Sequence, residues 1–284
     1  MKVGIQLYSV RNRMAKDPAS AIKAVAAEGY RYLEVANHNA DKDSGLGFGV
    51  SAKEIREVLK EAGASVVSAH IFPMDPKSVE KVLEYHGEIG TKYIVMPMGF
   101  YTDREDTLRQ AEALNTVGKA CAKAGMALLY HNHFHEFQLF SGKTVFDTLM
   151  ENTDPGLVKI ELDTYWAMRG GQDPVRILKD YGERVRLIHQ KDFPTEFRGE
   201  INLIDKVNQG KIKVDMEYFI GVVSEKTFTE IGTGLMDIQS IIDAGNNICK
   251  TDYVILEQDF SQHDEIESIR ISMDSFRKFK GIQW

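Results

Sequence analysis

The sequence predicts a single-domain α/β fold, a (β/α)8 barrel. Three observations lead to this prediction: short β-branched or aliphatic runs recur along the 284 residues, amphipathic stretches lie between most of them, and the first seven runs start roughly 30 residues apart. Eight such units are the number that closes a barrel, and a single barrel commonly occupies about 250 residues.

Eight runs are the expected strands. Each is short and largely apolar, and each is separated from the next by a helical pattern or a longer connection. Strands of this kind are buried on both faces, which is typical of a parallel sheet and not of a sandwich. In chain order they cover residues 2–8, 30–36, 64–71, 92–98, 126–133, 158–163, 185–192 and 253–259.

The amphipathic stretches are the expected helices, because apolar residues recur near i, i+3, i+4 and i+7. Start and stop signals agree with this prediction. Asp17 stands before Pro18, the pattern of an N-cap followed by proline at the first helical position. Gly63 and Gly125 follow helices as C-terminal breakers. The expected helices include residues 18–29, 51–63, 78–90, 106–125, 173–183 and 236–245.

The interval between strands seven and eight is about twice the usual length and predicts an insertion around residues 193–235. In a barrel, an insertion at the C-terminal face becomes a lid or a pocket wall. No linker rich in Gly, Ser or Pro interrupts the chain, so one domain is expected over residues 1–284. An open doubly wound sheet is the alternative, but no GxGxxG follows the first strand.

Composition excludes several partners. The formal net charge of -7 repels phosphate backbones and anionic lipid surfaces, so neither nucleic acid nor membrane is an expected partner. The sequence has no signal-peptide core at its start and no apolar run near 18 residues. Cys121 and Cys249 imply no disulfide framework. We therefore expect a cytoplasmic protein, unless a leader precedes this chain in a longer one.

Carboxylates and imidazoles gather at the expected strand ends, where a barrel builds its active site. They would be costly in a low-dielectric barrel mouth unless a cation pairs with them. A divalent metal ion supplies that charge, and oxygen and nitrogen donors without thiolates suit Mn²⁺, Mg²⁺, Co²⁺ or Zn²⁺. The main strand-end residues are Glu34, His70, the cluster from His131 to Glu136, Asp163, His189, Lys191, Glu257 and Asp259.

Five motifs, "YHNHFHEF", "IELDTYW", "IHQKD", "ILEQD" and "EIGTGLMD", resemble the sugar phosphate isomerase/epimerase family, whose xylose isomerase-like TIM barrel belongs to the AP endonuclease family 2 superfamily. The resemblance covers essentially the whole chain. It implies one divalent metal ion held by a Glu, Asp, His and Glu set from strands five to eight. Asp163, His189 and Glu257 match this set well.

The fifth-strand ligand departs from the family pattern. Many members carry a glutamate directly at the strand end, where this chain has His131, and Glu136 lies about one turn beyond. Glu136 is assigned as the ligand, with His131 or His133 as a substitute.

The leading hypothesis is a metal-dependent sugar isomerase or epimerase, in which proton transfer passes through an enediolate. Glu136 and Glu257 would be the acid and base on opposite faces of the reacting carbon. Trp166 is either a core aromatic or the apolar wall for a sugar ring, and Glu34 either contacts the substrate or pairs with Lys191. The expected substrate-binding residues are His70, His131, His133, Trp166, Lys191 and Glu34.

Other functions remain open. The same site serves a 3-keto-glycoside lyase or hydrolase, or a dehydratase, in which His131 or His133 protonates the leaving group. A non-catalytic sugar-binding barrel predicts binding without turnover or metal dependence. A trinuclear zinc nuclease like endonuclease IV is disfavoured, because it needs more ligands and a basic track for a duplex.

The substrate is expected to be a small sugar or sugar derivative. Gly232 and Gly234 precede a helix, whose N-terminus is a position that can bind a phosphate group, but a tight turn is the preferred interpretation. The sequence leaves a homo-oligomer open.

Overall fold

Eight parallel strands form a closed barrel in the computed structural model, which describes residues 1–208 and 212–284. Around the barrel the strands follow the order β1, β10, β9, β8, β5, β4, β3, β2 and return to β1. The predicted fold class and all eight predicted strands are thereby confirmed. Their bounds are β1 Lys2–Gln6, β2 Tyr32–Asn37, β3 Ser65–Ile71, β4 Tyr93–Met96, β5 Ala127–His131, β8 Val158–Asp163, β9 Val185–Gln190 and β10 Tyr253–Leu256.

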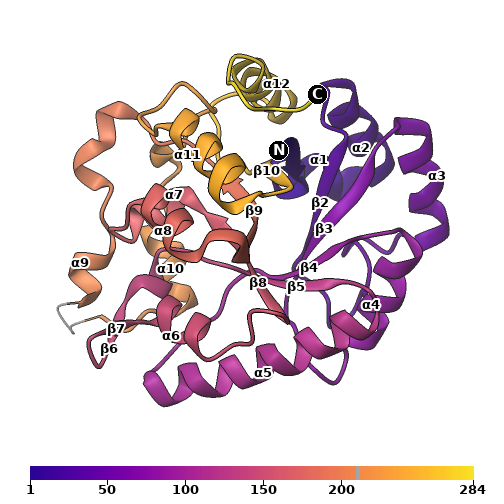
Figure 1. Cartoon of the computed structure of the whole chain (residues 1–284). Helices are drawn as coiled ribbons and strands as arrows, with labels where there is room; N and C mark the ends of the chain where they lie inside the picture. Colours follow the sequence, from indigo (N-terminus) through magenta and orange to yellow (C-terminus); the bar gives the residue numbers. More distant parts are fainter. Residues whose placement is uncertain (209–211) are drawn as a thin grey trace.

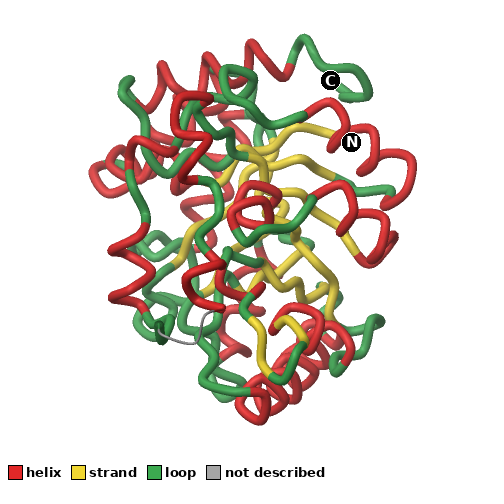
Figure 2. The backbone as a smooth tube through the Cα atoms, turned by 90° about the vertical axis from the view of Figure 1, so that its left-hand side faces the viewer, coloured by secondary structure: helices red, strands yellow, loops and turns green. Residues whose placement is uncertain are grey.

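Helices surround the strands and cover their outward faces (Figure 1, Figure 2). A short antiparallel pair, β6 Leu139–Phe140 and β7 Lys143–Thr144, lies outside the barrel sheet. Among the described residues, no helix is both long and apolar enough to cross a membrane. The described α-helices outside the segment between β9 and α11 are α1 Arg11–Lys16, α2 Pro18–Ala27, α3 Ala52–Ala62, α4 Val79–Glu88, α5 Arg104–Lys123, α6 Val145–Glu151, α7 Thr164–Arg169, α8 Pro174–Tyr181, α11 Ile238–Ala244 and α12 Glu265–Phe276.

The predicted start and stop residues cap the helices as expected. The Asp17 carboxylate accepts a hydrogen bond from the Ser20 amide at the start of α2. Ser51 and Glu54 form a capping box at the start of α3, and Gly63 ends this helix in the left-handed conformation at φ 62°.

Every second side chain of a strand points into the barrel, so successive inward-pointing residues form layers in the lumen. Near the N-terminal ends of the strands, Leu129, Leu187 and Ile255 form part of an apolar cluster separate from the main core. Two residues further along the same strands stand His131, His189 and Glu257. Because side chains two apart point to the same face, an apolar plug lies beneath a polar layer at the C-terminal end.

The segment between β9 and α11 contains two short helices, α9 Ile204–Lys206 and α10 Met216–Val222, and residues 209–211 of it lie outside the described residues. Buried Arg169 of α7 anchors this segment. Its guanidinium donates hydrogen bonds to the carbonyl oxygens of Glu200 and Ile201 and to the Thr227 hydroxyl. The insertion is therefore tied to the barrel near both of its ends.

Two neighbouring residues of α4 each bind a loop, Tyr85 the loop after β2 and His86 the turn before β4. Tyr85 donates a hydrogen bond to the Val50 carbonyl at 2.9 Å, and the buried His86 ring pairs its Nδ1 with the Thr91 hydroxyl at 3.0 Å. Burial lowers the pKa of His86 to about 4, against an ordinary value of 6.5. The ring is therefore neutral in the folded protein at neutral pH.

This lowered pKa predicts an acid-sensitive contribution to stability. The unfolded chain binds a proton at His86 below pH 6.5 and the folded chain does not, so stability is fully present above pH 6.5 and is lost as the pH falls toward 4. The loss attributable to His86 is at most roughly 3 kcal/mol. Urea unfolding between pH 7 and 4.5 should show a steeper decline for the wild type than for His86→Gln; parallel curves would contradict the prediction.

Candidate metal centre and substrate cavity

The polar layer at the C-terminal end of the barrel contains two overlapping groups of potential metal ligands. Within each group, one ligand atom per residue lies within 4.8 Å of all the others. The outer set consists of His131, Asp163, His189 and Glu257, and the inner set of His70, His131, Glu161 and His189. All of these residues are buried, so an uncompensated charge here would be expensive.

The outer set takes one residue from each of four successive positions around the barrel. His131 ends β5, Asp163 ends β8, His189 lies on β9, and Glu257 follows β10. The His131 Nε2 atom lies 3.5 Å from Asp163 Oδ2, and His189 Nδ1 lies 2.9 Å from Glu257 Oε2. Glu257 and His131 also line the main cavity, so this set is open to a substrate.

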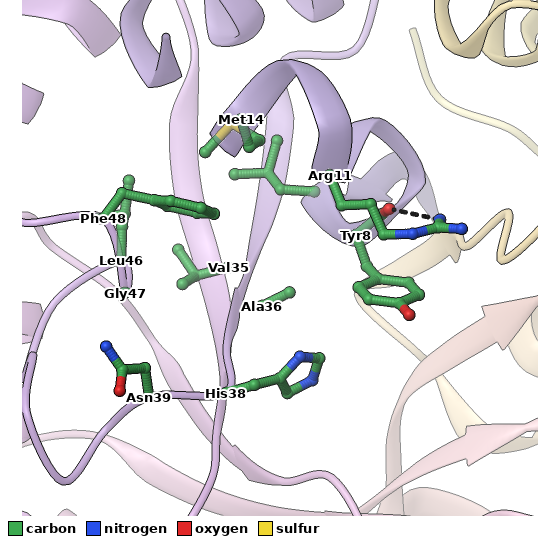
Figure 3. Close-up of a pocket in the computed structure, with 11 residues that line it drawn as sticks. Tyr8, Arg11, Met14, Val35, Ala36, His38, Asn39, Leu46, Gly47 and Phe48 are labelled. Carbon is green, nitrogen blue, oxygen red and sulfur yellow. Dashed lines mark hydrogen bonds between the residues drawn. The ribbon is translucent and has the colours of Figure 1, made fainter. Parts of the chain in front are cut away.

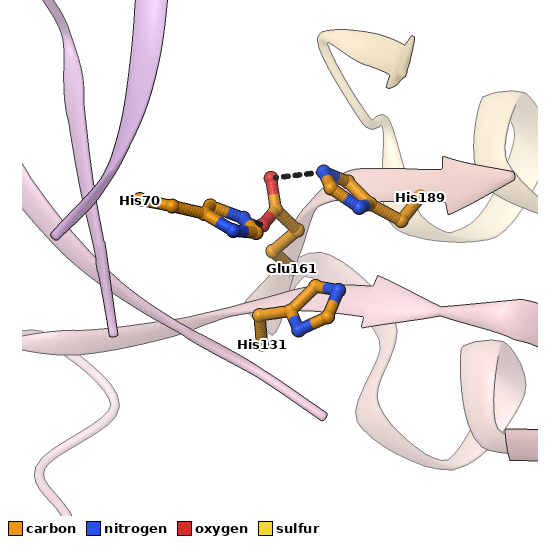
Figure 4. Close-up of side chains that lie close together, drawn as sticks. All are labelled: His70, His131, Glu161 and His189. Carbon is orange, nitrogen blue, oxygen red and sulfur yellow. Dashed lines mark hydrogen bonds and ion pairs between the residues drawn. The ribbon is translucent and has the colours of Figure 1, made fainter. Parts of the chain in front are cut away.

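The inner set shares His131 and His189 with the outer set and adds His70 and Glu161 (Figure 4). His70 Nε2 stands 2.6 Å from Glu161 Oε2 and 3.2 Å from Glu34 Oε1. Glu161 in turn reaches His189, whose Nε2 lies 3.4 Å from its Oε1 atom. Figure 4 shows the Glu161 carboxylate between the rings of His70 and His189.

His189 connects the two sets through its two ring nitrogens. Nε2 lies 2.5 Å from Glu34 Oε1, and Nδ1 faces Glu257 in the outer set. Glu34 is itself held by Gln6, which donates to Oε1 at 2.8 Å. When a carboxylate accepts a hydrogen bond from Nε2–H, Nδ1 keeps a lone pair that can bind a metal ion. Metal-binding histidines are usually supported by such a hydrogen bond.

A hydrogen bond to an acceptor also determines the tautomer of His131. Its Nδ1 atom lies 2.9 Å from the Pro97 carbonyl oxygen, which can only accept, so Nδ1 carries the proton. The buried Nε2 atom then presents a lone pair, and no described group donates a hydrogen bond to it. An orphaned buried nitrogen among carboxylates fits a divalent cation, and the outer set supplies the oxygen and nitrogen donors such an ion prefers.

Charge is crowded in this layer. Burial and the neighbouring Glu34 carboxylate raise the pKa of Glu161 well above its usual range. Burial alone would lower the pKa of Lys191, but Asp163, Asp259 and Glu257 raise it well above its ordinary value. The Lys191 ammonium lies 2.8 Å from Asp163 and also contacts Glu257. Lys191 therefore neutralises part of the negative charge in this layer, and a bound cation would neutralise more of it.

The structure does not group Glu136 with the other predicted ligands. Its Oε1 accepts a hydrogen bond from the Tyr130 hydroxyl at 2.8 Å, and its Oε2 accepts one from the His133 amide at 2.9 Å. Tyr130 and His131 are adjacent on β5 and point to opposite faces, so Glu136 follows Tyr130 into the shell between strand and helices. His131 occupies the fifth-strand position that the sequence assigned to Glu136.

The remaining predicted residues divide into two groups. His70, His131, His133 and Trp166 line the main cavity, as the substrate-binding expectation requires. Glu34 and Lys191 do not appear in its lining but lie buried beneath it. The contact between Glu34 and His189 replaces the ion pair with Lys191 that the sequence suggested.

The main cavity has a volume of about 580 Å³. Its floor is the polar layer, and residues of α10 together with several aromatic side chains form its other walls. Trp166 packs against the His133 ring, with centroids 5.5 Å apart, and Phe219 packs against His133 at 5.0 Å.

A second cavity of about 240 Å³ adjoins the first, and both are lined by Tyr8 and His38 (Figure 3). Arg11 lies over the Tyr8 ring, with its guanidinium carbon 4.4 Å from the ring centroid. Figure 3 shows Phe48 on the opposite wall from Arg11. The rest of the wall of this second cavity consists largely of apolar side chains from β2, α1 and the loop after β2.

Sequence reasoning missed the site residues Glu161 and Phe219 and the role of Asp192. Glu161 stands two residues before Asp163, so the period of a strand already directs it into the lumen. Phe219 lies in the insertion, whose path no local pattern specifies.

The glycine turn after the insertion is closed by a side chain of the protein. The Asp192 carboxylate accepts hydrogen bonds from the amides of Gly232, Gly234 and Met236. A Cβ at Gly234 would lie 2.3 Å from Asp192 Oδ1, which explains why glycine stands there. These amides are occupied by a carboxylate, which agrees with the interpretation as a tight turn.

The residues 22–279 match the family described as xylose isomerase-like TIM barrel. The chain belongs to this family. The match confirms the resemblance to the xylose isomerase-like TIM barrel that the motifs indicated.

Curated relatives and solved structures agree with this assignment. The chain is 28% identical to an inosose dehydratase of Clostridium beijerinckii over 186 residues, 66% of this chain and 54% of that protein. It spans about half the length of the curated relatives it matches. Its structure resembles a sugar phosphate isomerase/epimerase of Parabacteroides distasonis, with a TM-score of 0.79, 24% identity and coverage of 99% and 95% of the two chains. A 3-keto-D-glucoside 4-epimerase of E. coli shares the fold, with a TM-score of 0.65, 15% identity and coverage of 98% and 99%.

The geometry of β5 predicts which residue holds the cation. In His131→Ala the outer set loses a ligand, so we expect metal content after reconstitution and dialysis to fall from near one ion per chain to a small fraction. Glu136→Gln should retain the ion, because this carboxylate is hydrogen-bonded outside the lumen. Elemental analysis of both variants checks the prediction, and the reverse pattern would restore Glu136 as the ligand.

The contact between Glu34 and His189 predicts a supporting role for Glu34. Glu34→Gln should weaken cation binding by about 10- to 100-fold without abolishing it, because a neutral amide oxygen is a weaker acceptor for His189 Nε2–H than the carboxylate and leaves the ring less strongly polarised. Glu225→Gln is a matched control, since this carboxylate lines the cavity rim but has no contact with His189 in the described structure. Competition with a chelating dye measures both affinities, and an equal effect of the two changes would refute the role.

Proposed function

We propose that this chain is a metal-dependent lyase that eliminates an oxygen substituent β to the carbonyl of a keto sugar or ketocyclitol. The observation that carries the proposal is the position of Glu136. The sequence predicted an isomerase or epimerase in which Glu136 and Glu257 remove and return a proton from opposite faces of the reacting carbon. With Glu136 outside the cavity, the acid and base groups on the β5 side are imidazoles instead.

The reaction balances as a β-elimination. A base removes the proton from the carbon next to the carbonyl, the electron pair becomes a carbon–carbon double bond, and the β carbon–oxygen bond breaks. The leaving oxygen takes up a proton, so the products are an unsaturated ketone and water or an alcohol. A divalent cation in the outer set would polarise the carbonyl oxygen and so acidify the neighbouring C–H bond.

His133 is the residue best placed to move the proton. Its ring lines the cavity between Trp166 and Phe219, and its buried Nδ1 has no hydrogen-bond partner among the described residues. The hydrogen bond from its amide to Glu136 holds the backbone at this point. Asp259, which also lines the cavity and lies 3.8 Å from Lys191, can pass a proton to the leaving oxygen from the β10 side.

The names of the relatives support an elimination at least as well as an isomerisation. Curated relatives that match this chain include inosose dehydratases, which are named for loss of water from a keto compound. We propose the same class of reaction, with one divalent metal ion, for this chain. Epimerisation is the second candidate, because His133 and the pair Glu257 and Asp259 reach the cavity from different strands.

A direct assay separates the two candidates. The metal-loaded protein is mixed in deuterated buffer with an inosose, a 3-keto-glucoside or a ketohexose, and the products are followed by ultraviolet absorbance and NMR. Appearance of an unsaturated ketone together with the released water or alcohol supports elimination. Deuterium at the α carbon with inverted configuration and no released group would instead show an epimerase, and binding without either change would show a non-catalytic barrel.

The proposal predicts opposite outcomes for two neighbouring residues. His133→Gln should lower kcat by about 100-fold or more, the usual contribution of a positioned acid or base. Glu136→Gln should keep kcat within a few-fold, because the amide oxygen can still accept from the His133 amide while the amide NH2 donates to the Tyr130 hydroxyl, which can donate to Tyr101 instead. Steady-state rates on whichever substrate turns over test this; a large loss in Glu136→Gln alone would favour the two-carboxylate mechanism.

A further inference from the structure

The wall of the main cavity opposite the metal ligands is apolar. Four residues from α10 and its end, Met216, Phe219, Ile220 and Val223, line it in succession. Phe72, Pro97, Met98 and Phe260 continue this surface from other loops. Glu225 is the one polar side chain that the insertion contributes to the described cavity lining.

Part of this apolar surface remains open to solvent. Ile220 is 65% exposed and Met216 is 40% exposed, although both line the cavity. Among the described residues, the other exposed large apolar side chains are Phe48, which lines the second cavity, and Leu139 and Trp284, which line neither. Exposed apolar side chains gathered on the rim of a cavity mark a surface that a ligand covers.

A lone sugar ring does not account for such a wall. Every hydroxyl of a bound sugar needs a hydrogen-bond partner, and the polar floor offers these from His70, His131, His133 and Glu257. A hydroxyl placed beneath α10 would lose its water without gaining a partner. The cavity volume of about 580 Å³ lies in the range that holds a drug-sized ligand, so the ligand reaches beyond the floor.

We propose that the leaving group of the eliminated substrate is an apolar, ring-sized alcohol or phenol, held between α10 and Phe260. This inference rests on the proposed elimination and names its substrate class: a keto-glycoside with an apolar aglycone. The β carbon–oxygen bond to the aglycone breaks, and the aglycone oxygen takes the proton that water would carry in a dehydratase. The protein is then a glycoside lyase that releases an alcohol.

Binding of unoxidised glycosides tests the aglycone site separately from catalysis. Phenyl β-D-glucoside and methyl β-D-glucoside have the same sugar and lack the ketone, so neither can be eliminated. Isothermal titration of the metal-loaded protein should show the phenyl glucoside binding about tenfold tighter or more, as burial of one aromatic ring predicts. Equal affinities for the two glucosides would overturn the inference.

Variants place the site on α10. Phe219→Ser and Ile220→Ser should each reduce the ratio of the two affinities, and Ile220→Ser keeps the test valid if Phe219→Ser fails to fold. Leu139→Ser is the matched control, because this exposed apolar residue lies on β6 outside both cavities and should leave the ratio unchanged. Loss of the ratio in Phe48→Ser but not in the α10 variants would place the aglycone in the second cavity and overturn the assignment.

The outcomes also separate this inference from the proposed function. If the phenyl preference holds but no unsaturated ketone forms from a keto-glycoside, the aglycone site stands and the elimination falls. If elimination occurs from an inosose while the two glucosides bind equally, the elimination stands and the aglycone site falls.

Discussion

Negative charge buried in the barrel is the constraint on which the rest of the site depends. The carboxylates of Glu34, Glu161, Asp163, Glu257 and Asp259 share the lumen with the Lys191 ammonium. Carboxylates in a low-dielectric interior are tolerated only when cations or protons compensate them. The raised pKa of Glu161 favours its protonated form, which meets part of this demand, and the outer set is arranged so that a divalent cation can meet more of it. The stability of the barrel and its capacity for chemistry therefore arise from the same charges.

The hydrogen bonds beneath the ligands determine what those charges can do. The Pro97 carbonyl and the Glu34 carboxylate each accept from one nitrogen of an outer-set histidine, so the other nitrogen faces the carboxylates of the set. The Pro97 carbonyl would not be recognised as functional from its position in the chain, and Glu34 was expected to contact the substrate or Lys191, not to orient a histidine. They act by fixing which atom of a neighbouring histidine is available to a metal ion.

Much of this arrangement was predictable from the sequence, and the reason is periodicity. All eight strands follow from apolar runs, and Asp163, His189 and Glu257 follow from strand ends, because in a parallel barrel every strand delivers its C-terminus to one face. The same period of two would have found Glu161 and would have separated Glu136 from His131, since the latter pair straddles the end of β5. Phe219 and the path of the insertion could not be predicted, because long-range contacts such as those of Arg169 hold that segment and no local pattern encodes them.

The floor and the opposite wall of the cavity determine different aspects of its function. The floor comes from regular strands, whose register fixes the position of each ligand, so it determines which bond can be activated. The opposite wall comes from an insertion held to the barrel by a few side chains, so its composition can change without disturbing the strands. In this chain the wall is apolar while the floor is charged, and the boundary between them passes at His133, between Trp166 and Phe219. A substrate that spans this boundary places its scissile bond beside the imidazole only if one end is a polyol and the other is not.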